Sequence, residues 1–232
     1  MIRFNGWSIE APDVPSFLSA FYYIFVRRIY AFKSFDPHGI VVDCGANIGL
    51  SVLYFKTMYP SLRVVAYEAD PVICRTLERN VMANRLEGVE VINAAVGAGA
   101  GTVSFLQDGS DSGRVTDDLQ SGKHVIEVDA VCLRDELAGR DVPFLKVDIE
   151  GAETDALIGC AGRLSQVGSM FVEFHAFAEK PQRLGQLLAV LEEAGFRVAI
   201  ESIQDVKTPL TLADRARSNG MDLQLHIFAY RD

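Results

Sequence analysis

The most constraining feature of the sequence is the stretch VVDCGANIGLS at residues 41–51, where an apolar strand runs into an acid and then into a turn bracketed by two glycines. After the turn, apolar side chains recur at helical spacing up to Pro60. A strand that passes through a tight turn into a helix is the repeating unit of a parallel sheet covered by helices. The stretch therefore predicts an α/β fold and raises the question of which ligand the turn holds.

Strand-like and helix-like segments alternate along the rest of the chain. Strands are expected at residues 40–46, 63–69, 89–97, 124–131, 143–151, 169–175, 196–202 and 223–230, with a hairpin extension at 102–107. Helices are expected at residues 17–32, 50–58, 70–84, 152–160 and 181–194. Because no helical pattern separates the last two strands, they are expected to pair antiparallel. The alternation predicts a mainly parallel sheet whose ligands bind at the carboxyl ends of the strands.

Length and composition limit the class of protein. A chain of 232 residues with 49% hydrophobic and 23% charged residues fits one globular domain. The net charge of −9 argues against a nucleic-acid partner, since phosphate binding needs concentrated Lys and Arg. We therefore expect a small-molecule acceptor as the partner. The oligomeric state is left open, with a homodimer as one option.

Two features bear on the compartment. The four cysteines are far apart and form no C-x-x-C pair, so neither a zinc site nor a disulfide framework is indicated. The most lipid-like segment, residues 17–32, is interrupted by Arg27 and Arg28, well short of the ~20 apolar residues that a membrane span needs. We expect a cytoplasmic protein without a membrane contact. The aromatic residues of this segment are expected to pack in the core or to form a lid that excludes water.

The turn departs from the phosphate-binding motifs. A dinucleotide site would read G-x-G-x-x-G, but Asn47 replaces the middle glycine between Gly45 and Gly49, and no P-loop motif is present. The turn suits a nucleoside that carries an amino-acid group, because Asp43 can meet an ammonium and the first N–H groups of the helix can meet a carboxylate. Glu68, at the end of the second strand, can accept both hydroxyls of a ribose. This combination predicts S-adenosylmethionine as the cofactor.

Five segments between about residues 40 and 176 form a series: VVDCGANIGLSVLYF, YEADP, VINAAVG, LKVDIEGAE and VEFH. Together they resemble the motifs of the FkbM family of S-adenosylmethionine-dependent methyltransferases, a branch of the class I superfamily. The resemblance implies a three-layer Rossmann-like sandwich with a seven-stranded sheet in the order 3-2-1-4-5-7-6, strand 7 being antiparallel. It also implies methyl transfer, usually to an oxygen of a sugar or natural product. We expect a single domain over residues 1–232, with an N-terminal helical cap at 1–39 and a Rossmann-like core at 40–232.

The expected cofactor contacts extend beyond the turn. The third strand is expected to edge the adenine at Asn93 and Ala94, while Ala69 follows the ribose-binding acid of the second strand. Asp148, in the fourth strand, is expected beside the transferred methyl group. The expected cofactor-binding residues are Asp43, Gly45, Asn47, Gly49, Glu68, Ala69, Asn93, Ala94 and Asp148.

The expected catalytic residues lie on the fourth and fifth strands. Lys146, Asp148 and Glu150 alternate in LKVDIEG and share one face while that strand stays extended, and Glu173 and His175 do the same in VEFH. We expect Asp148, His175, Glu173 and Lys146 to serve catalysis, with Lys146 at least as the ion-pair partner of Asp148. Two mechanisms stay open: His175 or Asp148 acts as a general base on an acceptor hydroxyl, or the acids hold Mg²⁺.

Residues 108–123 are polar, contain glycine and lack periodicity, and a long loop of this kind in a compact domain is usually functional. Asp111 and Arg114 in this loop are therefore candidates for substrate contacts. Two rival functions stay open. One is a nicotinamide-dependent oxidoreductase, which Asn47 and Leu50 disfavour. The other is a non-catalytic nucleoside-binding subunit of a larger complex.

Overall fold

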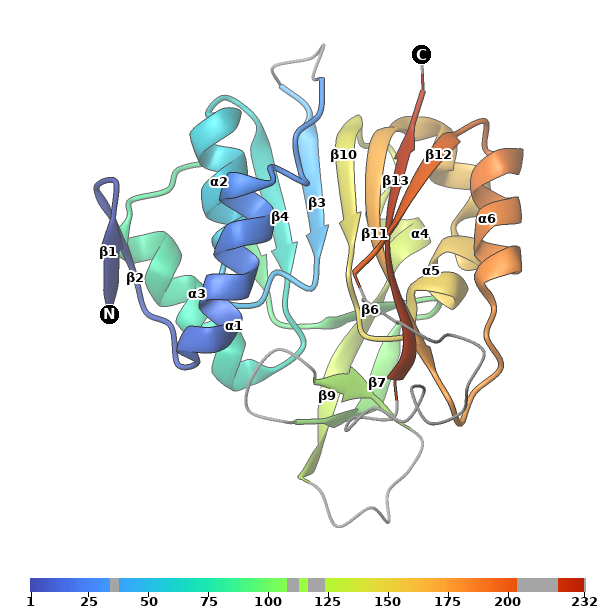
Figure 1. The fold of residues 1–232 in the computed structure, drawn as a ribbon, viewed down its shortest axis with the longest axis horizontal. Coiled ribbons are helices and arrows are strands. Elements are labelled where there is room, and N and C mark those ends of the chain that lie inside the picture. Colours follow the sequence, from blue (N-terminus) through green and yellow to red (C-terminus); the bar gives the residue numbers. More distant parts are fainter. Residues whose placement is uncertain (34–37, 108–112, 117–123, 204–220, 232) are drawn as a thin grey trace.

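The centre of the computed structural model is a seven-stranded sheet (Figure 1). In spatial order its strands are β12 (Arg197–Ser202), β13 (Met221–Tyr230), β11 (Val167–Phe177), β10 (Val142–Val147), β3 (Ile40–Cys44), β4 (Arg63–Tyr67) and β5 (Val89–Ile92). β13 lies between β11 and β12 and runs antiparallel to both. When these seven strands are numbered 1 to 7 in chain order and read across the sheet from β5, the order is 3-2-1-4-5-7-6. This is the order that the family resemblance implies. The structure describes residues 1–33, 38–107, 113–116, 124–203 and 221–231.

Helices cover both faces of this sheet (Figure 1). Successive side chains of a strand point to opposite faces, so Val41 packs into one helical layer and Val42 into the other. The first layer contains α1 (Val14–Phe21), α2 (Leu50–Met58) and α3 (Pro71–Ala83). The second contains α4 (Leu133–Glu136), α5 (Glu153–Gly159), the 3₁₀ turn η2 (Ala161–Gln166) and α6 (Leu184–Glu193). The molecule thus has the expected three-layer Rossmann-like architecture.

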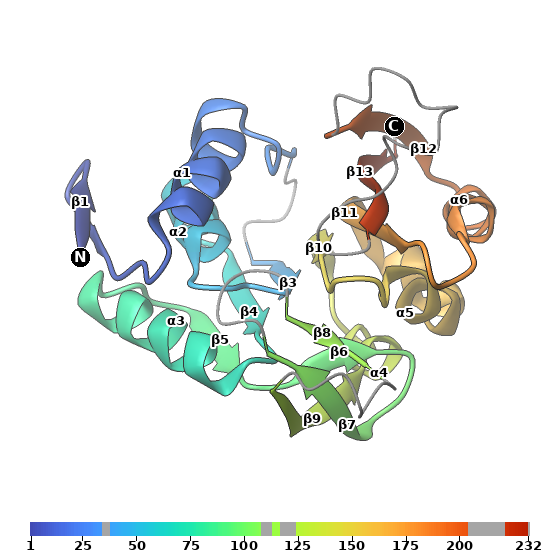
Figure 2. The same ribbon diagram turned by 60° about the horizontal axis from the view of Figure 1, so that its bottom comes forward.

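A second, four-stranded sheet lies beyond one end of the main sheet (Figure 2). Its order is β6 (Ala95–Gly97), β9 (Val125–Cys132), β7 (Gly101–Leu106) and β8 (Arg114–Val115). The expected strand at 89–97 is therefore wrong as one element, because the chain leaves the main sheet after Ile92 and enters the second sheet at Ala95. The expected hairpin extension at 102–107 corresponds to β7, which pairs antiparallel with β9 and β8.

The N-terminal region is less helical than the sequence predicts. Its first residues form a hairpin of β1 (Ile2–Phe4) and β2 (Trp7–Ile9). α1 begins after Asp13, whose carboxylate accepts a hydrogen bond from the Ser16 amide, and continues as the π-helix η1 (Tyr22–Val26). The expected helix at 17–32 is thus too long at its end, since Arg28 adopts the left-handed φ of 55°. Within the described part of the chain, no helix has the length and apolar character to cross a membrane.

Candidate active site

The glycine turn after β3 is packed so tightly that it admits no side chain at two positions. Gly45 has φ +83°, and a Cβ there would lie 1.8 Å from the carbonyl oxygen of Asp148. Gly49 has φ +92°, and a Cβ there would lie 2.6 Å from Leu77 Cδ1. Asn47 also has a positive φ, of 48°, which Asn tolerates better than most residues. The two glycines therefore let the turn close against the end of β10 and against α3.

Glu68 ties this turn to the start of α3. It follows β4, and its two carboxylate oxygens accept hydrogen bonds from the amides of Asn47 (2.8 Å) and Asp70 (2.9 Å). Burial raises the pKa of Glu68 to about 7, although these backbone hydrogen bonds oppose the shift. Glu68 lines a cavity of the structure, as Asn47 does. The two backbone hydrogen bonds thus fix the orientation of both Glu68 oxygens beside the cavity.

The residues expected around adenine divide into two groups. Ala69 and Ala94 line the cavity. Asn93 is exposed and is not among the lining residues, but its side-chain amide donates hydrogen bonds to the carbonyl oxygens of Glu68 (2.8 Å) and Ala69 (3.1 Å). Asn93 therefore holds the rim of the cavity in place from outside.

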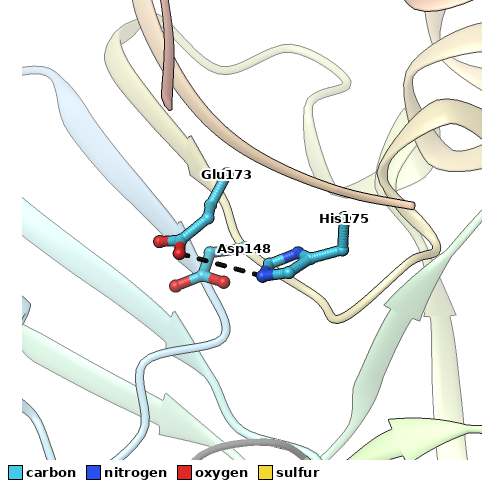
Figure 3. Close-up of side chains that lie close together, drawn as sticks. All are labelled: Asp148, Glu173 and His175. Carbon is cyan, nitrogen blue, oxygen red and sulfur yellow. Dashed lines mark ion pairs between the residues drawn. The ribbon is translucent and has the colours of Figure 1, made fainter. Parts of the chain in front are cut away.

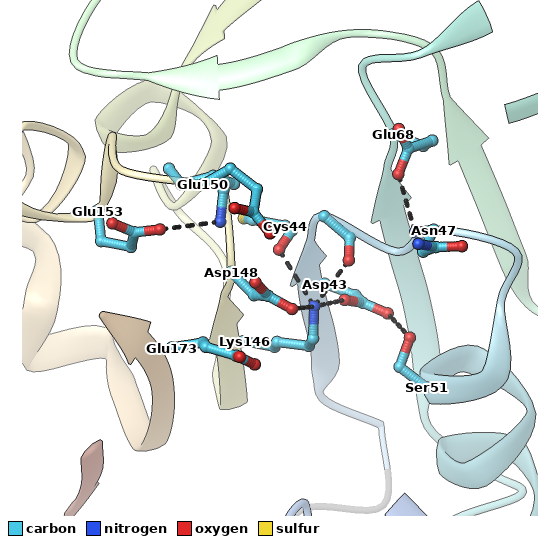
Figure 4. A network of polar contacts seen from close by, with 12 residues as sticks. Asp43, Cys44, Asn47, Ser51, Glu68, Lys146, Asp148, Glu150, Glu153 and Glu173 are labelled. Atoms are coloured by element: carbon cyan, nitrogen blue, oxygen red, sulfur yellow. Dashed lines mark hydrogen bonds and ion pairs between the residues drawn. The ribbon is translucent and has the colours of Figure 1, made fainter. Parts of the chain in front are cut away.

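Asp43 and Lys146 are neighbours in register on β3 and β10 and form a buried ion pair behind the turn (Figure 4). Asp43 is fully buried and does not line the cavity; its carboxylate accepts a hydrogen bond from Ser51 Oγ (2.5 Å) and lies 3.4 Å from Lys146 Nζ. Lys146 Nζ also donates to the carbonyl oxygen of Gly45 (2.7 Å). Burial lowers the pKa of Lys146, but Asp148 and Asp43 outweigh burial and raise it well above its ordinary value. The lysine is thus a fixed cation that holds the turn.

The strand expected at 143–151 is shorter than predicted and ends as β10 at Val147. Asp148 and Glu150 lie beyond it in irregular backbone, and Glu150 adopts a φ of 55°. The strict alternation expected for LKVDIEG is therefore wrong after Val147. Both acids still line the cavity, and Asp148 Oδ2 lies 3.1 Å from Lys146 Nζ. Burial raises the pKa of Asp148 to about 6 and that of Glu150 to about 8.

His175 lies beside Asp148 and Glu173 (Figure 3) and is buried. Its side chain is 1% exposed, and it is not among the residues that line the cavity in the described part of the chain. Nδ1 lies 3.0 Å from Glu153 Oε1, while Nε2 lies 3.7 Å from Glu150 Oε1 and 3.8 Å from Glu173 Oε1. Burial lowers the pKa of His175, but these three carboxylates outweigh burial and raise it well above its ordinary value.

Two residues that the sequence analysis missed, Gln224 and His226, complete this end of the cavity. Both lie on β13, where His226 is paired in register with Glu173 of β11. Gln224 Nε2 donates to Glu173 Oε1 (2.5 Å), and His226 Nε2 lies 3.7 Å from Glu173 Oε2. Burial opposes ionisation of Glu173, but contact with His226 and the charges of His175 and Lys146 lower its pKa to about 2.

The cavity has a volume of about 450 Å³ and runs from the glycine turn to the Glu173 end. α1 and η1 form part of its wall through Phe17, Tyr23 and Ile24. The Tyr23 ring meets the His226 ring edge-on, with centroids 5.3 Å apart. Phe17 is also part of the core, as expected, whereas the lid expected as the alternative stays a prediction. Of the loop candidates, Arg114 pairs with Glu179 at 3.7 Å, and Asp111 lies outside the described residues.

Solved structures share this fold. The chain resembles Methyltransferase FkbM from Methylobacillus flagellatus, with a TM-score of 0.54 and 19% identity over 89% of this chain. It spans 47%, about half, of the length of that protein. It also resembles M. jannaschii TYW2 in complex with AdoMet, with a TM-score of 0.51 and 16% identity over 98% of this chain and 83% of that one. The fold is therefore that of the Rossmann-like methyltransferases.

Sequence comparison gives the family. The model of the methyltransferase FkbM domain matches residues 43–198, more than half of the chain, so the protein belongs to the FkbM methyltransferase family. Methyltransferase 1 of Beauveria bassiana is 26% identical over 220 residues, which cover 83% of this chain and 87% of that protein. The 31-O-demethyl-FK506 methyltransferase FkbM of Streptomyces tacrolimicus is 26% identical over 213 residues, 77% of this chain and 81% of that protein.

Proposed function

We propose that the protein transfers the methyl group of S-adenosylmethionine to a hydroxyl oxygen of a small-molecule acceptor, a sugar or a natural product. The observation that carries this proposal is one cavity that two sets of residues line. We call the glycine turn with Glu68 its first end, and Glu173 with His226 its second end. Asp148 joins the two, because its backbone packs against Gly45 and its carboxylate lies near Glu173. A two-substrate transfer needs such a cavity, because donor and acceptor must be held in line and shielded from water.

The first end fits the cofactor. Glu68 is proposed to accept the ribose hydroxyls, and Ala69 and Ala94 give a small, apolar border for the adenine. Gly45, Asn47 and Gly49 are proposed to bring backbone N–H groups to the amino-acid part of the cofactor. Asp43 takes an indirect part in this proposal, because its carboxylate is buried on Lys146 and supports the turn from behind. M. jannaschii TYW2, which shares the fold, was solved in complex with AdoMet, and this supports S-adenosylmethionine as the ligand.

The second end faces the acceptor. The cofactor supplies an electrophilic methyl group, so the protein has to orient the acceptor oxygen and assist the loss of its proton. Asp148 and Glu173 line the cavity and can accept hydrogen bonds from hydroxyl groups, while Phe17 and Tyr23 provide apolar contact area. The name of the S. tacrolimicus relative places a methyl group on an oxygen of a natural product, which supports an acceptor of this class.

The proposal is tested first by binding. At about 100 times its dissociation constant, a ligand stabilises the native state by about 2.7 kcal/mol. S-adenosylhomocysteine should therefore raise the melting temperature clearly, and NAD should not. A shift with NAD alone would favour the nicotinamide-dependent oxidoreductase. Methyl transfer from labelled S-adenosylmethionine to a panel of sugars and polyketides then separates an enzyme from a non-catalytic binding subunit, which would bind the cofactor without turnover.

We also propose that the protein is cytoplasmic. All four cysteines are buried and unpaired, as expected for a chain that folds in a reducing compartment. Fractionation of the native host tests this placement directly.

A further inference from the structure

Three side chains from two adjacent strand ends are arranged around one point at the edge of the cavity (Figure 3). Asp148 follows β10, and Glu173 and His175 lie on β11, next to β10 in the sheet. Each residue offers one ligand atom, and these three atoms all lie within 4.8 Å of one another. Two atoms that share a cation at bonds of about 2.0–2.6 Å lie at most about 4.0–5.2 Å apart. The spacing is therefore compatible with a common metal ion.

The imidazole is oriented as a metal ligand would be. Glu153, whose side chain is 1% exposed, lies 3.0 Å from Nδ1 of His175 and so fixes the ring. Nε2 of the ring is turned toward Asp148 and Glu173 (Figure 3). A carboxylate on the far nitrogen is the usual partner of a metal-binding histidine. Nε2 itself is 3.7–3.8 Å from Glu150 and Glu173, too far for hydrogen bonds. Its nearest polar neighbour is Gln224 Nε2 at 3.4 Å, at the outer limit of a hydrogen bond.

The surroundings are also predominantly acidic. Glu150 Oε2 is buried and has no hydrogen-bond partner among the residues that the structure describes. Four carboxylates, from Asp148, Glu150, Glu153 and Glu173, gather here. The permanent cation among them, Lys146, is bound to Asp148 Oδ2, which leaves the other oxygen of that carboxylate for a second partner. A buried carboxylate without a partner is costly, and a bound cation removes that cost.

We propose that Asp148, Glu173 and His175 bind one divalent cation beside the acceptor end of the cavity. One nitrogen and two carboxylate ligands suit Mn²⁺ better than Mg²⁺, which prefers oxygen ligands alone, and better than Ca²⁺, which needs more of them. Asp148 and Glu173 line the cavity, whereas His175 is buried, so the open coordination positions face the cavity. A catalytic role of this cation, which rests on the proposed function, would be to hold the acceptor hydroxyl and lower its pKa.

The test is a titration of the full chain with MnCl₂, followed by electron paramagnetic resonance, in which bound Mn²⁺ loses the signal of the free ion. One equivalent should bind to the wild type. Asp148→Asn, Glu173→Gln and His175→Gln should each weaken binding by about tenfold or more, and Glu153→Gln by about 10- to 100-fold through the orientation of the ring. Asp155→Asn is the matched control, because Asp155 is an exposed acid on the same helix as Glu153, paired with Arg183. It should leave binding unchanged.

Calorimetry with S-adenosylhomocysteine on the same samples shows that each variant is folded and keeps the two proposals apart. Wild-type protein that binds S-adenosylhomocysteine but none of Mn²⁺, Mg²⁺ and Zn²⁺ would overturn the metal site and leave the proposed function standing. Mn²⁺ binding that is equal in wild type and His175→Gln would overturn the ligand set. Mn²⁺ binding lost in the three ligand variants, in a protein without affinity for S-adenosylhomocysteine, would support the metal site and refute the proposed function.

Discussion

Glu68→Gln gives the sharpest prediction, because the structure shows what both carboxylate oxygens do before any ligand arrives. Each oxygen accepts one backbone N–H, from Asn47 and from Asp70. In the variant, the new NH₂ group would face one of these amides, so one hydrogen bond to a charged acceptor is lost. The ribose contact proposed for Glu68 is weakened as well. At about 1.5–3 kcal/mol for such a bond, the affinity for S-adenosylhomocysteine should fall by roughly 10- to 100-fold at pH 8.

The pH dependence follows from the same residue. The pKa of Glu68 is raised from 4.5 to about 7, so the folded protein binds this proton more tightly than the unfolded chain does between these values. The stability of the ligand-free wild type should therefore fall as the pH rises from 4.5 to 7, by at most about 3 kcal/mol at 1.36 kcal/mol per unit. Ribose hydroxyls donate to the ionised form, so ligand affinity should instead rise over the same range. It should be about tenfold weaker at pH 6 than at pH 8, where most molecules are ionised.

Isothermal titration calorimetry at pH 6, 7 and 8 measures the affinity for S-adenosylhomocysteine, and urea unfolding between pH 4.5 and 7 measures the stability of the ligand-free protein. Other groups titrate in this range, notably Asp148 and Glu150. The change of affinity with pH in the wild type is therefore compared with the change of affinity with pH in Glu68→Gln. Glu90→Gln is the matched control, since Glu90 is an exposed acid on β5, and it should keep the wild-type profile. An unchanged affinity and an unchanged pH dependence of that affinity in a folded Glu68→Gln protein would refute the assignment of Glu68.

Three further predictions concern stability and are measured by urea unfolding. Gly45→Ala would place a Cβ 1.8 Å from a carbonyl oxygen at φ +83°, so it should cost about 3 kcal/mol or more or yield no folded protein; a near wild-type midpoint would contradict the packing of the turn. Lys146→Met leaves Asp43 buried without its cation and should cost about 3–5 kcal/mol, whereas a loss under 1 kcal/mol would mean that the pair is not closed in solution. Arg27→Ala removes an exposed pair with Glu201 and should cost less than about 1 kcal/mol; a larger loss would show a structural role for this contact.

The sequence predicted the main sheet because its central strands are covered on both faces. Such strands are continuous apolar runs, and the residues Val41 and Val42, which face opposite helical layers, are both fully buried. The FkbM family and its Rossmann-like fold could be predicted for the same reason, because the motifs follow the ends of strands that the apolar runs define. The family model and the solved structures confirm both. The helix after the turn and the antiparallel last strands were also predicted correctly.

Strand ends and partners were harder to predict, because they depend on tertiary contacts. Nothing in VINAAVG separates β5 from β6, since both halves are apolar and the break at Asn93 is set by its hydrogen bonds to the neighbouring strand's end. β10 likewise stops at Val147, because Gly45 packs against the next carbonyl and turns the chain away. The second sheet was missed for a similar reason: the sequence shows that β7 and β9 are strands but not which strands they join.

The site shows what a motif can and cannot specify. A motif marks residues at strand ends. Whether such a side chain lines the cavity or is buried against another side chain depends on the residues of the neighbouring elements. Asp43 and His175 were both expected at the cavity, yet each is buried against a partner from the main sheet or from α5. Gln224 and His226, which line the cavity, lie in a stretch that reads only as a strand. They reach Glu173 because β13 inserts between β11 and β12, a pairing that brings together residues about 50 positions apart. Gly45, Asn47 and Gly49 belong to one strand–turn–helix unit and could be predicted to line the cavity or to shape its turn, whereas the part around Glu173 is assembled by strand pairing between distant segments.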